Sequence, residues 1–141
     1  LEIERAYLTR DGRPLDLAAV GQGDLLVMRV RLRSLSGRLD NVAVVNLLPS
    51  GLEVENPRLE SAETLPWISD ADLAVAHLDL RDDRVVVFAS LPDTSWRTHY
   101  ALLRAVTPGT FRLPPLQAEA MYDPAIRATG ERGTIEIAVR R

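Results

Sequence analysis

The chain has 141 residues, enough for one domain with a core of its own, and its 46% hydrophobic and 26% charged residues are typical of a globular domain. Its 17 basic residues, all of them Arg, are outnumbered by 20 acidic residues, and a net charge of −3 disfavours nucleic acid as a partner. The absence of Cys excludes a disulfide framework, a thiolate metal site and a Cys nucleophile.

The first half of the chain predicts short strands, because no window keeps a helical period over three turns. Apolar or alternating runs lie at residues 1–9, 15–20, 24–34, 42–48 and 52–54. Turn signals separate these runs, among them Asp11-Gly12 and Pro49-Ser50-Gly51. The run at 42–48 is almost continuously apolar and rich in Val, as expected of a central strand that is covered on both sides.

A long connection and a hairpin are expected next. Residues 55–72 contain two prolines, several acidic residues and no period, which indicates a loop with Trp67 packed onto the fold. The runs at 75–80 and 85–90 flank Arg81-Asp82-Asp83-Arg84. This polar four-residue connection predicts a hairpin built around a type I turn.

The remaining strands are expected at residues 96–106, 111–113, 117–122 and 133–139. Pro114-Pro115 cannot donate to a ladder, so this segment should lie at an edge or cross between sheets. Asp123-Pro124 is expected to turn the chain. The whole pattern predicts a single all-β domain over residues 1–141, an immunoglobulin-like antiparallel β-sandwich of about seven to nine strands.

Residue types that could carry catalysis are present without a catalytic arrangement. The hydroxyl and imidazole candidates are Ser90, Ser95, His77 and His99. No nucleophile elbow surrounds either serine, and no spacing places a base beside a nucleophile. We therefore predict that the chain is not an enzyme.

Metal and phosphate sites are likewise not expected. Asp70-Ala71-Asp72 and Asp82-Asp83 could offer oxygen ligands, but neither has EF-hand spacing, and solvated acids are the favoured interpretation. Two histidines without Cys make a weak zinc pattern. Gly21-Gln22-Gly23 lacks the third glycine of a dinucleotide fingerprint and is interpreted as a turn. No metal and no cofactor are predicted.

Three arginines with a spacing of two follow one another within residues 24–34. Arg29, Arg31 and Arg33 should lie on one face of a strand, opposite the apolar positions between them. Neighbours on that face are about 6.5–7 Å apart, so the three could meet an acidic surface together. A solvated face with local ion pairs is the favoured interpretation, and a contact with a neighbouring domain is the alternative.

The Met121-Tyr122 pair is the sharpest candidate for a binding surface. Taken alone, a Met and a Tyr are more often core packing or edge cover, because both side chains bury apolar area. Strand alternation would place them on opposite faces. They would both project only if the backbone bends, and the following Asp123-Pro124 would allow such a bend.

Three longer phrases carry a family resemblance: NLLPSGLEVENPRL, RDDRVVVFASL and YALLRAVTPGTFRLPPLQAEAMYDP, at residues 46–59, 81–91 and 100–124. With them the chain resembles the C-terminal, tenth macroglobulin-like domain of bacterial α2-macroglobulins, the broad-spectrum protease-trapping inhibitors of the periplasm. In such proteins this domain keeps a thioester, made from a Cys-x-Glu-Gln motif in a helical domain, away from water. Cleavage of a bait region by a protease exposes the thioester, which then traps the attacker.

The resemblance implies a non-catalytic domain excised from a much larger periplasmic protein, a candidate lipoprotein of the inner membrane. Its partners would be the thioester domain and other macroglobulin-like domains of the same chain, and target proteases through the full-length protein. No apolar run approaches the roughly 20 residues that span a bilayer, so direct membrane insertion is not expected.

By the same resemblance, Met121 and Tyr122 are assigned to the thioester shield, with Pro114, Pro115 and Asp123-Pro124 holding the loop. A thioether and a phenol can provide the dry, apolar cover that an activated acyl group needs. The alternative class is an immunoglobulin-like adhesion or carbohydrate-binding module of a surface protein. An aromatic content of 5% gives that alternative little support.

Overall fold

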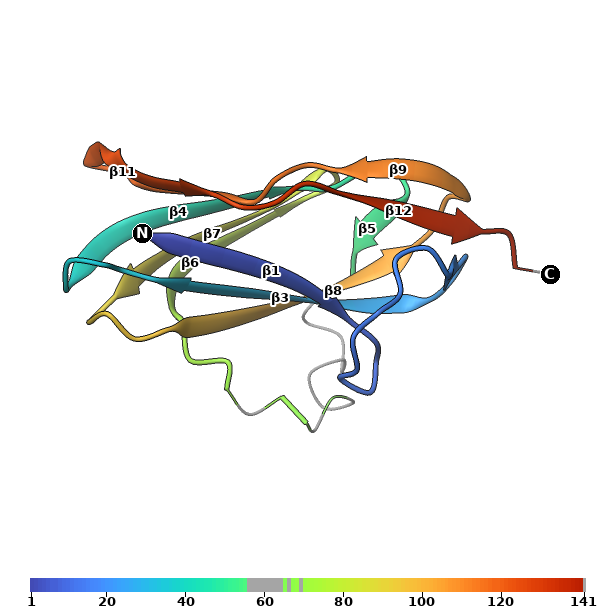
Figure 1. The fold of residues 1–141 in the computed structure, drawn as a ribbon, viewed down its shortest axis with the longest axis horizontal. Helices are drawn as coiled ribbons and strands as arrows, with labels where there is room; N and C mark the ends of the chain where they lie inside the picture. Colours follow the sequence, from blue (N-terminus) through green and yellow to red (C-terminus); the bar gives the residue numbers. More distant parts are fainter. Residues whose placement is uncertain (56–64, 66, 69, 141) are drawn as a thin grey trace.

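The computed structural model describes residues 1–140 except 56–64, 66 and 69. Within that part of the chain all regular structure is β, which confirms the predicted fold class (Figure 1). The strands are β1 (Glu2–Leu8), β2 (Val20–Gly21), β3 (Leu25–Arg33), β4 (Leu39–Leu47), β5 (Leu52–Val54), β6 (Ala74–Arg81), β7 (Arg84–Leu91), β8 (Arg97–Ala105), β9 (Gly109–Leu113), β10 (Gln117–Ala120), β11 (Asp123–Thr129) and β12 (Gly133–Ala138). The described residues contain no helix that could cross a membrane.

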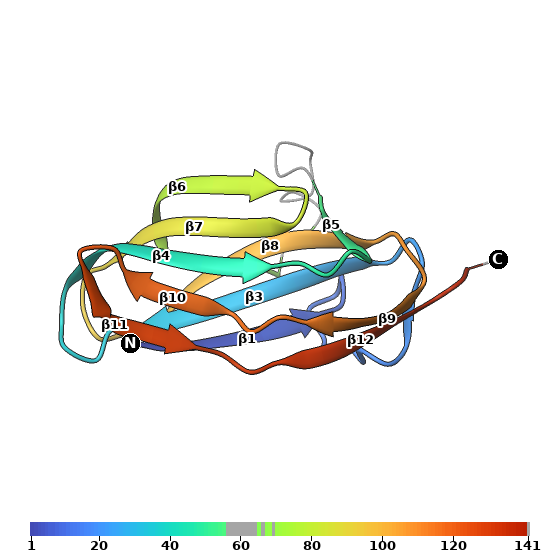
Figure 2. The ribbon, with the colours of Figure 1, turned by 90° about the horizontal axis from the view of Figure 1, so that it is seen from above.

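Two sheets pack face to face as a sandwich. One has four strands in the order β1-β3-β8-β5, and the other has five in the order β11-β10-β4-β7-β6. Figure 1 shows most of β4 above β3 and β8. A small third sheet, β2-β12-β9, continues the sandwich toward the C-terminus (Figure 2).

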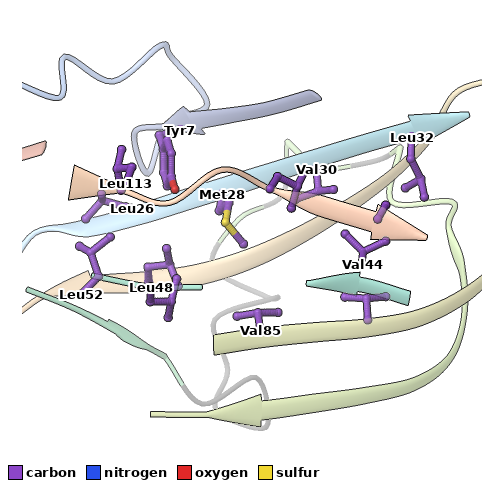
Figure 3. Packing of buried hydrophobic residues seen from close by; sticks show 14 of the residues in the cluster. Tyr7, Leu26, Met28, Val30, Leu32, Val44, Leu48, Leu52, Val85 and Leu113 are labelled. Atoms are coloured by element: carbon purple, nitrogen blue, oxygen red, sulfur yellow. The ribbon is translucent and has the colours of Figure 1, made fainter. Parts of the chain in front are cut away.

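The core forms because strand alternation sends one set of side chains inward from each sheet. β3 contributes Leu26, Met28 and Leu32, each at most 1% exposed, and β7 contributes Val85 and Val87 from the facing sheet. Figure 3 shows Leu26, Met28, Leu32 and Val85 among the side chains that fill the space between the layers. Full burial of such a side chain stabilises the fold by roughly 1.5–3 kcal/mol.

The strand count is higher than predicted, with twelve strands in the described residues. β2 and β5 hold only two and three residues, lengths at which backbone pairing decides what is a strand. β11 occupies a segment that Asp123-Pro124 predicted to turn. One pairing also departs from the antiparallel expectation, since β2 runs parallel to β12.

Strand β4 is central in its sheet, as predicted, but only one of its faces is fully buried by this chain. Val42 and Val44 are buried in the core, whereas Leu47 on the other face is 40% exposed. The prediction of cover on both sides was therefore wrong for the described residues. A Val-rich run tells how apolar a strand is, and tertiary packing decides what covers it.

The β6–β7 hairpin lies where the sequence predicted one, but its loop has two residues instead of four. Arg81 pairs with Arg84, so Asp82-Asp83 alone connects the strands. The two prolines behave as expected as well, because Pro114-Pro115 carries the chain from β9 in the small sheet to β10 in the five-stranded sheet.

Trp67 packs against the outer face of the four-stranded sheet, as the sequence predicted, while most of the 55–72 connection lies outside the described residues. Its ring meets Tyr100 edge to face at 5.8 Å between centroids, and its indole N–H donates to the Arg10 carbonyl at 2.8 Å. Gly12 lies under the ring with a φ of 82°, where a Cβ would come within 3.0 Å of Trp67. Only glycine fits this turn without strain.

Candidate functional site

The candidate site is the turn that joins β10 to β11. Ala120 pairs with Asp123, so Met121 and Tyr122 form the whole turn. Both side chains project into solvent, with 48% of Met121 and 84% of Tyr122 exposed. The sequence left core packing and exposure both open. In the structure both side chains are exposed, because residues in a turn do not follow the alternation of a strand.

Strand β11 corrects the predicted turn at Asp123-Pro124, which lies just after the actual one. A register shift between Glu119 and Ala120 leaves residues 124–126 without partners on β10. β11 is also the edge of its sheet. Proline is tolerated at such an irregular edge position, where its missing N–H removes no ladder bond, so the strand continues through it.

The base of the hairpin is firmly attached to the core. Leu116, just before β10, is fully buried, and its carbonyl accepts the Gly130 N–H at 2.7 Å from the end of β11. Ala118 and Ala120 on β10 are each 3% exposed. The exposed tip is therefore held by a buried base.

Arg5 braces the segment that leads into β10, a role that sequence reasoning missed. Its guanidinium donates to the Pro114 carbonyl at 2.9 Å and to the side-chain oxygen of Asn46. Asn46 in turn donates to the sulfur of Met28 in the core. Burial raises the pKa of the neighbouring Tyr7, although Arg5 counteracts this effect. The available signal was that Arg5 shares the inward face of β1 with Tyr7.

The three arginines of β3 lie as the spacing predicted, on the outer face of the four-stranded sheet. Arg31 pairs with Glu4 at 2.7 Å and Arg33 with Glu2 at 3.1 Å, both on β1. Exposed pairs of this kind contribute about 0.2–1 kcal/mol. The Nε of Arg29 is buried without a hydrogen-bond partner among the described residues. The contact with a neighbouring domain stays a prediction.

The two tryptophans are engaged within the chain. Trp96 lies beneath the guanidinium groups of Arg31 and Arg33, which are 5.2 and 4.9 Å from its ring centroid. Trp67 is packed on Tyr100, as described above. They therefore form no paired aromatic platform of the kind that a carbohydrate-binding module would present.

The structure does not bring the serine and histidine candidates into one site. His77 lies exposed on β6, beside the ring of Phe88, whereas His99 lies half-buried on β8 in the other sheet. Burial lowers the pKa of His99. Ser95 donates to the carboxylate of Asp93 two residues away. No nucleophile and base meet among these residues.

The acidic pairs have two different surroundings. Asp70 accepts the Tyr100 hydroxyl at 2.6 Å, and burial together with this hydrogen bond raises the pKa of Tyr100 to about 12. Asp72 accepts the Thr98 N–H at 2.8 Å. Asp70 and Asp72 are exposed, as the solvated interpretation expected, and each also accepts a hydrogen bond from the chain. Asp82-Asp83 is exposed too. The described residues contain no group of three metal-ligating side chains.

The fold and the exposed turn define a macroglobulin-type, immunoglobulin-like sandwich, and comparison with known proteins agrees. The family model described as "Bacterial Alpha-2-macroglobulin MG10 domain" matches residues 1–125. The chain therefore belongs to this family of bacterial alpha-2-macroglobulin domains. The match includes the Met121-Tyr122 turn.

Named relatives and solved structures give the same result. The alpha-2-macroglobulin of Xylella fastidiosa (strain Temecula1) is 37% identical over 141 residues, covering 92% of this chain and 8% of the relative. Native Escherichia coli alpha-2-macroglobulin, solved from domain MG7 to the C-terminus, superposes with a TM-score of 0.87 at 32% identity, over 96% of this chain and 23% of that one.

Salmonella alpha-2-macroglobulin reacted with methylamine superposes with a TM-score of 0.82 at 35% identity, over 96% of this chain and 9% of that one. The chain thus spans about a twelfth of the curated relative's length, since it covers 8% of it.

Proposed function

We propose that this chain is the part of a periplasmic bacterial α2-macroglobulin that packs on the thioester domain of the same protein and shields the thioester. The shield stabilises the uncleaved state, and a protease is trapped by the full-length protein after cleavage. The chain itself performs no catalysis. Contact with the other macroglobulin-like domains and anchoring of the parent as an inner-membrane lipoprotein belong to the same proposal.

The observation that carries the proposal is the exposed Met121-Tyr122 turn on a buried base. A soluble surface does not need two large side chains at one tip, and exposed apolar groups that adjoin one another commonly mark a contact. Burying a Met or a large aromatic side chain contributes roughly 1.5–3 kcal/mol. A phenol can in addition donate to a partner where the contact is wet at one end.

The chemistry of the relatives fits this assignment. The Salmonella protein has been solved after reaction with methylamine, a small amine nucleophile that opens thioesters. A thioester survives in water only if nucleophiles are kept away from its carbonyl carbon. The thioether of Met121 and the ring of Tyr122 offer no nucleophile at neutral pH and would exclude water from such a group.

The test is methylamine incorporation into the full-length gene product, before any protease is added, followed by mass spectrometry. Tyr122→Ala and Met121→Ala should take up methylamine roughly ten- to hundredfold faster than the unmodified protein, the change that loss of 1.5–3 kcal/mol of cover predicts. Val139→Ala is the matched control, since Val139 is 65% exposed just after β12, which runs toward the opposite end of the sandwich from the β10–β11 turn (Figure 2).

Two results would contradict the proposal. A protein that takes up no methylamine even after protease cleavage has no reactive thioester to protect. Equal uptake in all variants would remove Met121 and Tyr122 from the shield and leave the chain as scaffold.

A further inference from the structure

The beginning of β4 contains an irregularity that points toward the Met121-Tyr122 turn. Leu39 pairs with Leu91 and Val42 with Ala89, so β4 holds one residue more than β7 between these pairs, which is a β-bulge. Asn41 lies in the bulge with a φ of 58°, the one positive φ of a non-glycine residue among the described residues. Asn is among the few residues that adopt this left-handed conformation readily.

The bulge is bonded directly to the turn. The Met121 N–H donates to the Asn41 carbonyl at 2.9 Å, one step beyond the last regular pair of β10 with β4, Ala120 opposite Val42. β10 and β11 shift register at the same place, between Glu119 and Ala120. Figure 2 shows the β10–β11 hairpin beside the start of β4. Two neighbouring bulges thus meet where the exposed turn begins.

We propose that Asn41 is a positioning residue, whose left-handed backbone aims Met121 and Tyr122 outward as the shield. The inference rests on the proposed function. A bulge adds one residue to a strand and changes the direction in which the neighbouring backbone points, and bulges recur where a side chain has to be re-aimed. The Met121 N–H bond extends the β10–β4 register by one pair. A different φ at Asn41 would rotate the accepting carbonyl relative to Leu39, which is paired with Leu91 on β7.

The backbone of Asn41, and not its side chain, performs this role. The side chain is exposed and makes no hydrogen bond with the described part of the chain. What the position requires is a residue that tolerates positive φ. Gly and Asp meet that requirement, whereas a β-branched residue does not.

The experiment compares Asn41→Gly, Asn41→Asp and Asn41→Val in the full-length gene product, with methylamine uptake before protease as the readout. We expect Gly and Asp to leave uptake unchanged and Val to raise it about tenfold, because its strain is relieved when the turn moves away. Hydrogen exchange of peptides covering residues 117–123, measured by mass spectrometry, should be faster in the Val variant only. Normal methylamine uptake in Asn41→Gly would show that Asn41 acts through its backbone conformation and not through a contact of its side chain.

A Tyr122→Ala background completes the design. If Asn41 acts through the turn, Asn41→Val adds little to the acceleration that Tyr122→Ala already causes. Unchanged uptake in Asn41→Val overturns the inference, and so does an Asn41→Gly variant as fast as Asn41→Val. The inference is also overturned if the double variant takes up methylamine faster by the product of the two single-variant increases. Unchanged uptake in Tyr122→Ala would instead contradict the proposed function itself.

Should Asn41→Val fail to fold, Asn41→Ala replaces it, since Ala also disfavours positive φ without branching at Cβ. Faster uptake in Asn41→Ala than in Asn41→Gly supports positioning. Equal uptake in the two overturns it.

Discussion

Two hairpins of the five-stranded sheet end in two-residue turns of opposite character. The β6–β7 hairpin turns at Asp82-Asp83 and the β10–β11 hairpin at Met121-Tyr122. Their strands β6 and β11 are the two edges of the sheet, and the turns lie at opposite ends of β4, since Leu47 faces Arg84 and Val42 faces Ala120. The comparison distinguishes a turn with charged side chains, which favour hydration, from a turn with apolar side chains, which favour contact with a partner.

The polar groups of the charged turn Asp82-Asp83 are satisfied by this chain and by water. Arg84 pairs with Asp83 at 3.0 Å, and this hydrogen bond lowers the pKa of the Asp83 carboxyl. The apolar turn gains nothing comparable, because 48% of Met121 and 84% of Tyr122 remain exposed to water. A charged turn that is hydrated needs no partner. A turn that exposes the thioether of Met121 and the ring of Tyr122 is suited to contact with another surface.

The largest expected effect falls on the buried residues that hold the hairpins. Leu116 before β10 and Leu91 at the end of β7 are both fully buried and both lie far from their turns. Leu→Ala at either position should lower the free energy of unfolding by about 2–5 kcal/mol, measured by urea titration of the 141-residue chain. A much smaller loss at Leu116 would mean that the β10–β11 hairpin is loosely attached without its partner.

The next largest effect is expected when the residues of the two turns are exchanged. Met121→Asp with Tyr122→Asp in the full-length gene product should raise methylamine uptake about a hundredfold, because two carboxylates resist burial against a partner. The reverse exchange, Asp82→Met with Asp83→Tyr, is the control and should leave uptake unchanged. Equal behaviour of the two exchanges would remove the distinction between the turns.

A pH change should act on the edge of the sandwich that carries the charged hairpin. His99 lines a groove with Leu78 and Leu80 of β6, and burial lowers its pKa below the ordinary 6.5. As the pH falls through 6.5 the unfolded chain takes up the proton first, so the stability present above that pH is lost below it. Thermal melting should therefore begin lower at about pH 5.5 than at about pH 7.5.

His99→Gln is the control for this effect and should lessen the difference between the two melting temperatures. All other titratable groups are the same in the two proteins, so the comparison isolates the contribution of His99. An identical pH response in the variant would show that another group is responsible.

The smallest effect is on stability at the tips themselves. Tyr122→Ala and Met121→Ala should change the free energy of unfolding of the 141-residue chain by no more than about 0.5 kcal/mol, as expected of exposed side chains. Asp82→Ala should behave in the same way. A clear destabilisation by Tyr122→Ala in thermal melting would mean that the ring packs within this chain, and the apolar turn would no longer need a partner.

Local pattern predicted much of the framework and little of the site. Alternation in β3 placed Arg29, Arg31 and Arg33 on one face correctly, and the charged turn was found between two strong strands. The dipeptide Asp123-Pro124 misled, because it is typical of a turn, while the edge of a sheet also tolerates it. The bond from Met121 to Asn41 joins positions too distant in sequence for any local pattern to connect.

By itself, the amino-acid sequence determined the all-β class, most of the strands and the absence of a catalytic motif, because period and turn chemistry act over a few residues. The tertiary structure alone decided that β4 has one open face, that Arg5 supports Pro114, and that Met121 and Tyr122 both project. Register, bulges and edge position arise from pairing between distant strands, and these decide which side a residue faces.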